Sequence, residues 1–217
     1  MNSNPFIVPF ARLPVTLPVF PLTGAVLMPG NELPLNIFEP RYLNMTGDAM
    51  SGDRLIGMIQ PDADDAQGNG LCKTGCAGRI TQYRETRDGR LEIVLTGVCR
   101  FDIAEELSSV RGYRLIVPDW SRFHDDYADN ENTLHSEHDL LIHTLKEYFA
   151  AKQLEVDWTA LEQLPVVKLM DSLGMALPLS GPDKQVLLES VEPEERLRTF
   201  IAVLRSAIDA PGTASRH

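Results

Sequence analysis

The sequence lacks the long apolar segments that would tie a protein to a membrane. No run of about 18 apolar residues occurs, and residues 1–30 do not combine a basic start with an uninterrupted apolar run. We therefore expect neither a signal peptide nor a membrane span, and a cytoplasmic location. Cysteine is also scarce, because the chain has only Cys72, Cys76 and Cys99, at spacings that suggest no disulfide framework. This usage fits a reducing compartment.

Basic residues are also fewer than acidic ones. The chain has 20 Lys and Arg against 31 Asp and Glu, a formal net charge of −11. No cluster of Lys and Arg with interleaved aromatics appears, so we expect no nucleic-acid binding, and an anionic membrane surface is disfavoured by the same sign of charge. Residues 1–117 carry 11 basic and 13 acidic residues (net −2), whereas residues 118–217 carry 9 and 18 (net −9). The acidic second half would suit a basic protein partner.

Motifs for nucleotide binding and catalysis are missing as well. The chain contains no G-x-x-x-x-G-K-[ST] phosphate loop, and "GNGLCKTG" does not have the spacing of one. It contains no G-x-S-x-G elbow, and the carboxylate pairs Asp64-Asp65 and Asp125-Asp126 fall in expected loops, where such charges are usually solvated. The sequence therefore predicts no catalytic residue, no cofactor and no enzyme activity.

Two residue groups raise the question of a metal. His135 and His138 lie three apart in an expected helix and could share a ligand face, but no H-E-x-x-H signature accompanies them. The C-x₃-C pair of Cys72 and Cys76 lacks a convincing fourth ligand even with Cys99. We favour a solvated helix face for the histidines and a core position for Cys99, and we leave a redox role for Cys76 open.

What the first half does contain is short β-rich stretches separated by turn formers. Prolines at 18, 21, 29, 34 and 40 allow no long helix, yet the residues between them suit a core. The pattern predicts a long hairpin of residues 77–86 and 91–104 around Asp88-Gly89, and a helix that begins at Pro40 and ends before Gly52. The other expected strands are "VTLPVF", "AVLM", "ELPLNIF", "RLIGMI" and "YRLIVP".

The second half changes to helical periodicity. Apolar residues recur on one face of 133–152, the stretch from Trp158 to Leu177 is broken by Pro165, and a final helix opens at Pro193. Ser180 with Asp183 predicts a capping box ahead of "KQVLLES". The sequence thus predicts an α+β protein with a β-rich subdomain over 1–117, an acidic linker over 118–133, a helical subdomain over 134–210 and a disordered tail over 211–217.

Several of these stretches together resemble a known family. "LPVFPL", "MPG" and "LPLNIFEPRY", followed by "GCAGRITQY", "LEIVLTGVCRFDI" and "KQVLLESVEPEERLRTFIAVL", match in order the amino-terminal domain of the Lon protease family, from about Leu17 to Leu204. The chain looks most like relatives in which this domain stands alone, without the ATPase and protease domains. The resemblance implies a PUA-like, β-barrel-type subdomain followed by a helical one, and a role in recognising protein substrates.

Residues of "FEPRY" are the candidate site. Glu39, Arg41 and Tyr42 come together at the start of the expected helix, where they would form a polar rim for a bound peptide; the alternative is a purely structural attachment of this helix to the barrel.

Two hypotheses about function follow. In the first, the protein is a non-catalytic module that holds extended, unfolded or tagged polypeptide through backbone hydrogen bonds and apolar pockets and delivers it to a separate protease. In the second, the groove between barrel and helices binds a small ligand or carries a hydrolytic site.

Overall fold

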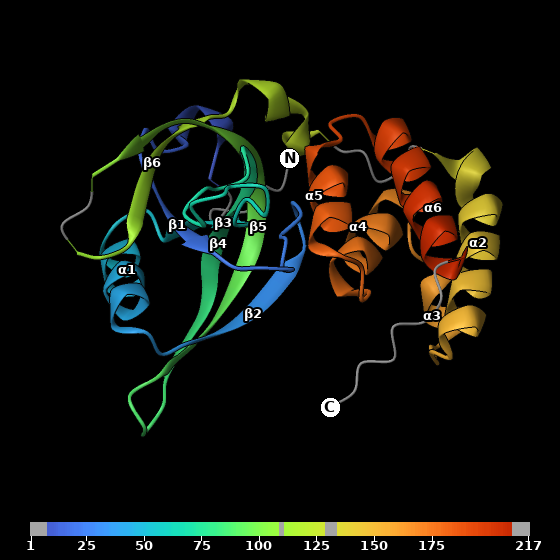
Figure 1. The fold of residues 1–217 in the computed structure, drawn as a ribbon, viewed down its shortest axis with the longest axis horizontal. Coiled ribbons are helices and arrows are strands. Elements are labelled where there is room, and N and C mark those ends of the chain that lie inside the picture. The colour runs from blue at the N-terminus through green and yellow to red at the C-terminus, as the bar shows by residue number, and fades with distance from the viewer. Residues whose placement is uncertain (1–7, 109–110, 129–133, 210–217) are drawn as a thin grey trace. The chain divides into compact units, whose positions relative to one another are not determined.

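The computed structural model describes residues 8–108, 111–128 and 134–209, which form two compact units divided between Ala128 and Asp129. Figure 1 shows strands in the first unit and helices in the second. The first unit contains β1 (Leu17–Pro21), β2 (Glu32–Ile37), β3 (Leu55–Ile59), β4 (Thr74–Glu85), β5 (Leu91–Leu107) and β6 (Arg114–Asp119), with one helix α1 (Pro40–Ser51) and the 3₁₀ segments η1 (Phe10–Arg12) and η2 (Ser121–Tyr127). The predicted α+β class is confirmed.

The six strands form one mixed sheet in the order β2-β5-β4-β3-β1-β6, with a further pairing of β6 to β5. Only β1 and β3 pair in parallel, and the other pairings are antiparallel. Pairing therefore passes from β5 through β4, β3, β1 and β6 back to β5, and β2 lies outside this circuit. The sheet is not a regular barrel, because the register shifts at two places between β4 and β5 and at one between β5 and β6.

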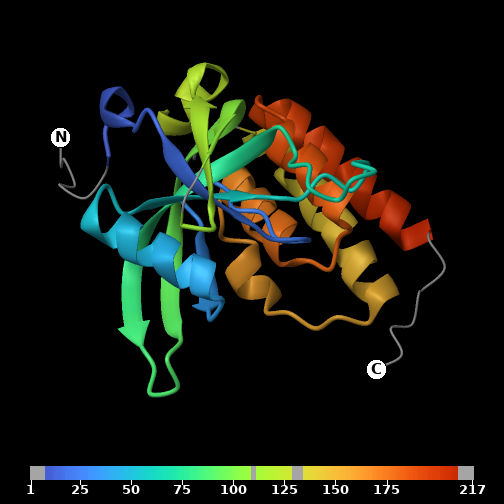
Figure 2. The same cartoon turned by 60° about the vertical axis from the view of Figure 1, so that its left-hand side comes forward.

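The long hairpin of β4 and β5 was predicted from its turn and is confirmed. Gly89 has a φ of +80°, which a side chain would disfavour, so the Asp88-Gly89 reversal uses the residue that fits it. Figures 1 and 2 both show the tip of this hairpin extending beyond the rest of the first unit. At the other end of the hairpin, Phe101 is fully buried in a core cluster with Leu17, Val19 and Ile116.

The stretch Ala25–Met28, predicted as a strand, is not one. Val26, Leu27 and Met28 are buried nevertheless, because this segment crosses close to β5. A Cβ at Gly97 would lie 2.1 Å from the Met28 carbonyl oxygen, so only glycine permits this approach. The apolar residues of this stretch are core residues, as expected, but they lie in a loop that packs on β5 and not in a strand.

The predicted acidic linker over 118–133 is wrong for its first part. β6 runs to Asp119, and η2 buries Phe123 completely. Asp126, expected to be solvated, is 5% exposed and forms an ion pair with Arg100, whose Nη2 lies 2.6 Å from Asp126 Oδ1. Because a β5 guanidinium neutralises this carboxylate, residues 118–128 belong to the first unit; 129–133 and the predicted tail over 211–217 lie outside the described residues.

The second unit contains the helices α2 (His138–Lys152), α3 (Trp158–Leu161), α4 (Val166–Ala176), α5 (Gly181–Glu189) and α6 (Pro193–Asp209), with η3 (His135–Glu137) before α2. The break at Pro165 and the start at Pro193 were predicted and are confirmed. Ser180 Oγ accepts the Asp183 amide at 3.2 Å, as expected for the cap of α5. Apolar faces of α2, α4 and α6 supply its core, which includes Leu141, Leu145, Leu169, Phe200 and Leu204.

Candidate functional site

Helix α1 places the predicted site at its amino terminus. Pro40 is the first helical residue, where its missing N–H costs nothing, and Glu39 is the N-cap residue with extended backbone. The Glu39 side chain does not cap the helix; instead Arg41 Nε donates to its Oε2 at 3.0 Å. Both side chains are about half exposed, so this pair forms a polar rim at the surface.

Tyr42 lies elsewhere, since its side chain is only 6% exposed. Its ring packs on Phe20 of β1, with the ring centroids 4.4 Å apart, and the Arg41 guanidinium lies 4.5 Å from the Tyr42 ring centroid. Burial raises the pKa of the Tyr42 hydroxyl above its usual 10.0. Tyr42 thus packs α1 against the sheet, and its ring contacts the Arg41 guanidinium. Glu39 and Arg41 remain accessible.

Sequence reasoning missed Phe38. This residue follows β2 directly and has 60% of its surface exposed, so its ring is available for contact with a partner. The Arg90 guanidinium, at the base of the β4–β5 hairpin tip, lies 5.8 Å from the Phe38 ring centroid. The sequence did carry a signal. Leu33, Leu35 and Ile37 occupy the odd-numbered positions and share one face of the strand, so the even-numbered Phe38 is expected on the other face.

The second half of α1 is held by the connection between β5 and β6. Asp48 accepts hydrogen bonds from Arg111 Nη1 and from the Tyr113 hydroxyl, each at 2.8 Å. Asn44 Oδ1 accepts a further bond from Arg111 at 3.3 Å. These polar contacts fix the second half of the helix, so the position of Glu39 and Arg41 does not depend on Tyr42 alone.

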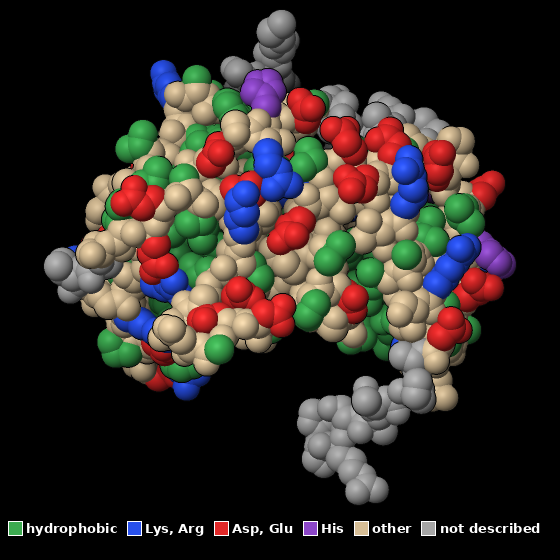
Figure 3. Space-filling model, turned by 45° about the horizontal axis from the view of Figure 1, so that its top comes forward, with side chains coloured by type: hydrophobic (Ala, Val, Ile, Leu, Met, Phe, Trp, Pro, Cys, Tyr) green, Lys and Arg blue, Asp and Glu red, His purple; other side chains and the backbone are tan. Residues whose placement is uncertain are grey.

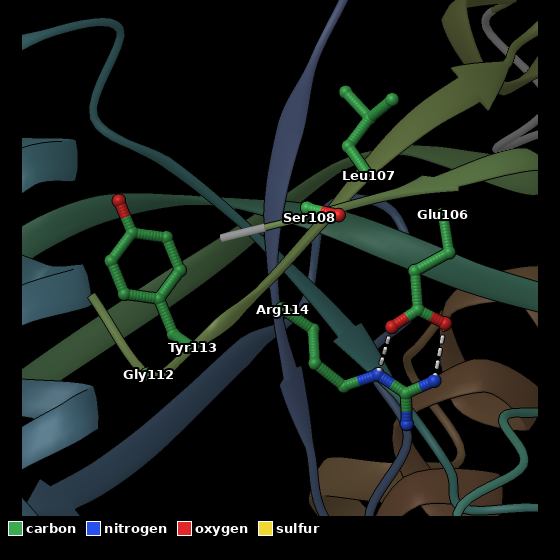
Figure 4. Close-up of a pocket in the computed structure, with 6 residues that line it drawn as sticks. All are labelled: Glu106, Leu107, Ser108, Gly112, Tyr113 and Arg114. Atoms are coloured by element: carbon green, nitrogen blue, oxygen red, sulfur yellow. Dashed lines mark hydrogen bonds and ion pairs between the residues drawn. The ribbon is translucent and has the colours of Figure 1, made fainter. Parts of the chain in front are cut away.

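Next to these contacts is an open pocket of about 450 Å³, lined by Glu106, Leu107, Ser108, Gly112, Tyr113 and Arg114. Figure 4 shows the Arg114 guanidinium facing the Glu106 carboxylate, with Nε donating to Oε1 at 2.6 Å, while the Tyr113 ring extends away from this pair. Arg114 Nη1 also donates to the Asn69 carbonyl at 2.7 Å. The guanidinium is thus already occupied by protein acceptors, which makes this pocket a poor anion site.

The cysteines lie in the first unit, where Cys72 is partly exposed and the other two are buried. Cys76 and Cys99 are fully buried, and burial raises the pKa of both thiols above 9.0. Cys99 donates weakly to the Phe123 carbonyl at 3.6 Å, so it packs β5 against η2 as a core residue. The redox role left open for Cys76 finds no accessible thiolate at this position to support it.

The histidine pair does not assemble into a described metal site. His138 Nδ1 lies 3.7 Å from Asp139 Oδ1, and the side chain of His135 is outside what the structure describes. Over residues 8–108, 111–128 and 134–209, no group of three or more His, Cys, Asp or Glu side chains is arranged to hold a metal ion. No helix of these described residues is long and apolar enough to cross a bilayer.

Fold and site together define an α+β protein with a strand-rich unit, a helical unit and a polar helix start at the surface. Residues 16–206 match the model of the ATP-dependent protease La (LON) substrate-binding domain, and the chain belongs to this family. The crystal structure of a Lon N-terminal domain protein from Xanthomonas campestris is 26% identical, with a TM-score of 0.64 over 86% of this chain and 97% of that one.

Whole Lon proteases are also similar. The Lon protease of Flavobacterium johnsoniae is 31% identical over 63% of this chain, and Lon protease 1 of Hydrogenovibrio crunogenus is 26% identical over 88%. The match covers 17% and 24% of these two proteins, so the chain spans about a quarter or less of their length. The predicted resemblance is confirmed, and it concerns the substrate-binding part of the relatives.

Proposed function

We propose that this protein recognises polypeptide substrates without turning them over, and that the accessible surface formed by Phe38, Glu39 and Arg41 takes part. The observation that carries the proposal is the family match over residues 16–206, whose description names substrate binding. The surface supports it, because an exposed aromatic ring beside a half-exposed ion pair offers both apolar contact and hydrogen bonding to a chain.

Phe38 has the chemistry needed to select unfolded chains. A folded protein buries most of its large apolar side chains, whereas an unfolded chain exposes them to partners such as a ring that is 60% exposed. Glu39 and Arg41 neutralise each other, so the rim favours neither charge strongly. Binding should therefore depend little on salt.

Three finer statements belong to the same proposal. The protein acts in the cytoplasm, passes bound chains to a separate protease and has no catalytic activity of its own. Its first unit is a PUA-like variant of a β-barrel, which the circuit of pairing from β5 back to β5 supports. Tyr42 serves this function indirectly, through the position of α1.

The test is fluorescence anisotropy with labelled, reduced and carboxymethylated α-lactalbumin, a permanently unfolded chain, and with the native protein as a folded control. We expect saturable binding of the unfolded chain alone, nearly unchanged between low and high salt. Phe38→Ala should weaken binding by roughly 1 kcal/mol, about fivefold. Val186→Ala, which truncates another exposed apolar residue in the second unit, is the matched control and should change nothing.

Two results would count against the proposal. Absence of saturation up to about 100 μM would remove unfolded-chain recognition as the function, since a Kd that high corresponds to only about 5 kcal/mol. Equal affinities of the wild type and Phe38→Ala for the unfolded chain would mean that the protein recognises such chains, but through a surface away from the start of α1.

A further inference from the structure

β2 is the one described strand with a single sheet neighbour, so it has an open edge along its whole length, and this edge leads directly to Phe38. Every other strand pairs with at least two neighbours, because β6 returns to β5, whereas β2 pairs only with β5 among the described residues. Figure 1 shows β2 alongside β5 at the margin of the sheet. An unpaired strand edge offers a row of main-chain donors and acceptors to another extended chain.

Hydrogen bonds around β5 show which β2 residues face outward. Gly97 accepts from Gly30 and donates to Asn31, so its main-chain groups face the β2 side. Val94 accepts a bond from the Thr81 hydroxyl on β4, so its main-chain groups face the β4 side. Because these directions alternate along a strand, the residues opposite Leu95, Ile93 and Leu91 bond to β5.

The other β2 residues, Glu32, Pro34 and Asn36, therefore direct their main-chain groups to the open edge. All three are exposed, so the edge is accessible. It presents three carbonyls but only two N–H groups, since Pro34 has none. Pro34 is thus on the side where a proline is tolerated in a strand, and it weakens the edge without closing it.

Side chains along this edge define what kind of chain would fit. Leu33 and Leu35 lie on one face, half-buried and next to the buried Ile93 and Leu95 of β5. Glu32 is the only charged residue of β2, is exposed and makes no ion pair with another described residue. An incoming strand would meet apolar surface on one face and a negative charge on the other.

We infer that an extended polypeptide segment, with apolar and basic residues in alternation, pairs antiparallel with the open edge of β2. This inference rests on the proposed function, because it specifies how the surface at Phe38 engages a chain. Apolar side chains would cover Leu33 and Leu35, and a basic one would lie opposite Glu32. Antiparallel pairing is the more stable arrangement per residue, and it brings the bound chain to Phe38.

The first test uses a fluorescein-labelled nonapeptide of alternating Lys and Val, with the intact protein. In antiparallel pairing the Lys residues would be opposite Glu32 and Asn36, so their N–H groups would meet the edge. N-methylation of the Lys residues should weaken binding about tenfold or more, whereas N-methylation of the Val residues should have little effect. Loss in the Lys-methylated peptide alone supports edge pairing; equal binding of the two methylated peptides, or loss in the Val-methylated peptide alone, overturns it.

Variants of the protein give the second test. Pro34→Val adds an N–H that points to the edge, so it should tighten peptide binding about three- to tenfold. Glu32→Lys should weaken binding about fivefold at low salt, whereas Glu155→Lys, the same change at an exposed site of the second unit, should not. Circular dichroism and thermal melts confirm that each variant is folded.

The outcomes separate this inference from the proposed function. If carboxymethylated α-lactalbumin binds but Pro34→Val leaves its affinity unchanged, edge pairing is wrong and unfolded-chain recognition stands. If neither that probe nor the nonapeptide binds, both fail. A concentration-dependent dimer that Glu32→Lys alters and that excludes the nonapeptide would assign the edge to a second copy of the chain and overturn the inference.

Discussion

The strand-rich unit and the helical unit are stabilised over different distances along the sequence. In the first, partners such as Leu17 and Ile116 are joined by sheet pairing across almost the whole unit. In the second, main-chain hydrogen bonds stay within each helix and a local cap such as Ser180 starts a helix, although α2 packs mainly on the distant α6. Residues 1–128 carry 12 basic and 16 acidic residues (net −4), and residues 129–217 carry 8 and 15 (net −7). Figure 3 shows carboxylates spread over one face, with few basic side chains between them. The recognition surface proposed above lies in the less acidic unit.

Each unit nevertheless contains a buried arginine–aspartate pair, and these pairs should have the largest effects. Arg100 and Asp126 are 3% and 5% exposed, and Arg196 and Asp171 are both 7% exposed with Nε 2.9 Å from Oδ1. Asp126→Asn or Asp171→Asn would leave a buried guanidinium uncompensated and should each cost about 3–5 kcal/mol.

The two tryptophans report these changes separately, because Trp120 packs on Phe101 in the first unit and Trp158 on Phe149 in the second. Because the two emissions overlap, single-tryptophan backgrounds are needed: Asp126→Asn should lower mainly the unfolding midpoint read from Trp120, and Asp171→Asn mainly the one read from Trp158. Equal shifts of both signals in both variants would mean that the units unfold as one.

Glycine substitutions should sharpen the contrast. At Gly97 an added Cβ meets the Met28 carbonyl at 2.1 Å, so Gly97→Ala should destabilise the first unit by about 3 kcal/mol. At Gly174, inside α4, the nearest atom is a Leu187 methyl at 3.4 Å, and alanine should be neutral or stabilise by up to about 1 kcal/mol. Denaturation midpoints of the two variants test this; a Gly97→Ala protein as stable as the wild type would show that the Met28 segment moves freely.

A cap in the helical unit should have an effect of intermediate size. Ser180 Oγ accepts the Asp183 amide, so Ser180→Ala should cost about 1 kcal/mol. The loss should appear in Trp158 fluorescence, and Ser180→Thr should restore most of it, because its hydroxyl can also donate to Asp183 Oδ2 as Ser180 Oγ does at 2.6 Å. An unchanged midpoint would mean that α5 is held by tertiary packing alone.

The smallest expected effect is a local pH dependence in the first unit. Hydrogen bonds from the amides of Gln67, Asn69 and Gly70 lower the pKa of Asp65 below 3.8. A lowered pKa in the folded state means that this carboxylate stabilises its loop above pH 3.8 and that the contribution is lost as pH falls through the lower folded value. NMR titration should show the three amides shifting together below pH 3.8, and Asp65→Asn should abolish that shift. A common midpoint above 3.8 would contradict the assignment.

Prediction from sequence succeeded where the signal was local. Pro40, Pro165 and Pro193 each marked a helix start or break, and Asp88-Gly89 marked the hairpin, because backbone geometry at these residues depends on few neighbours. The pairing of β6 with both β1 and β5 joins residues far apart in sequence and was not predictable from any one stretch.

Failures of prediction came from contacts between distant residues. The sequence alone indicated a solvated loop residue at Asp126, but Arg100 of β5 forms an ion pair with it. It indicated a surface residue at Tyr42, but Phe20 of β1 packs on the Tyr42 ring. Glu39 and Arg41 are accessible at the start of α1, as the sequence led us to expect, and their part in peptide binding stays a prediction. Phe38 and the open edge of β2 were missed, because exposure of a ring and absence of a strand partner are properties of the whole sheet.

Hydrogen exchange measured by mass spectrometry, with and without carboxymethylated α-lactalbumin, tests the central claim most directly. If β2 and the start of α1 recognise unfolded chains, amides within residues 32–41 should gain protection while those of residues 134–209 stay unchanged. Unchanged exchange over residues 32–41 in the saturated complex, or protection confined to the helical unit, would contradict the account.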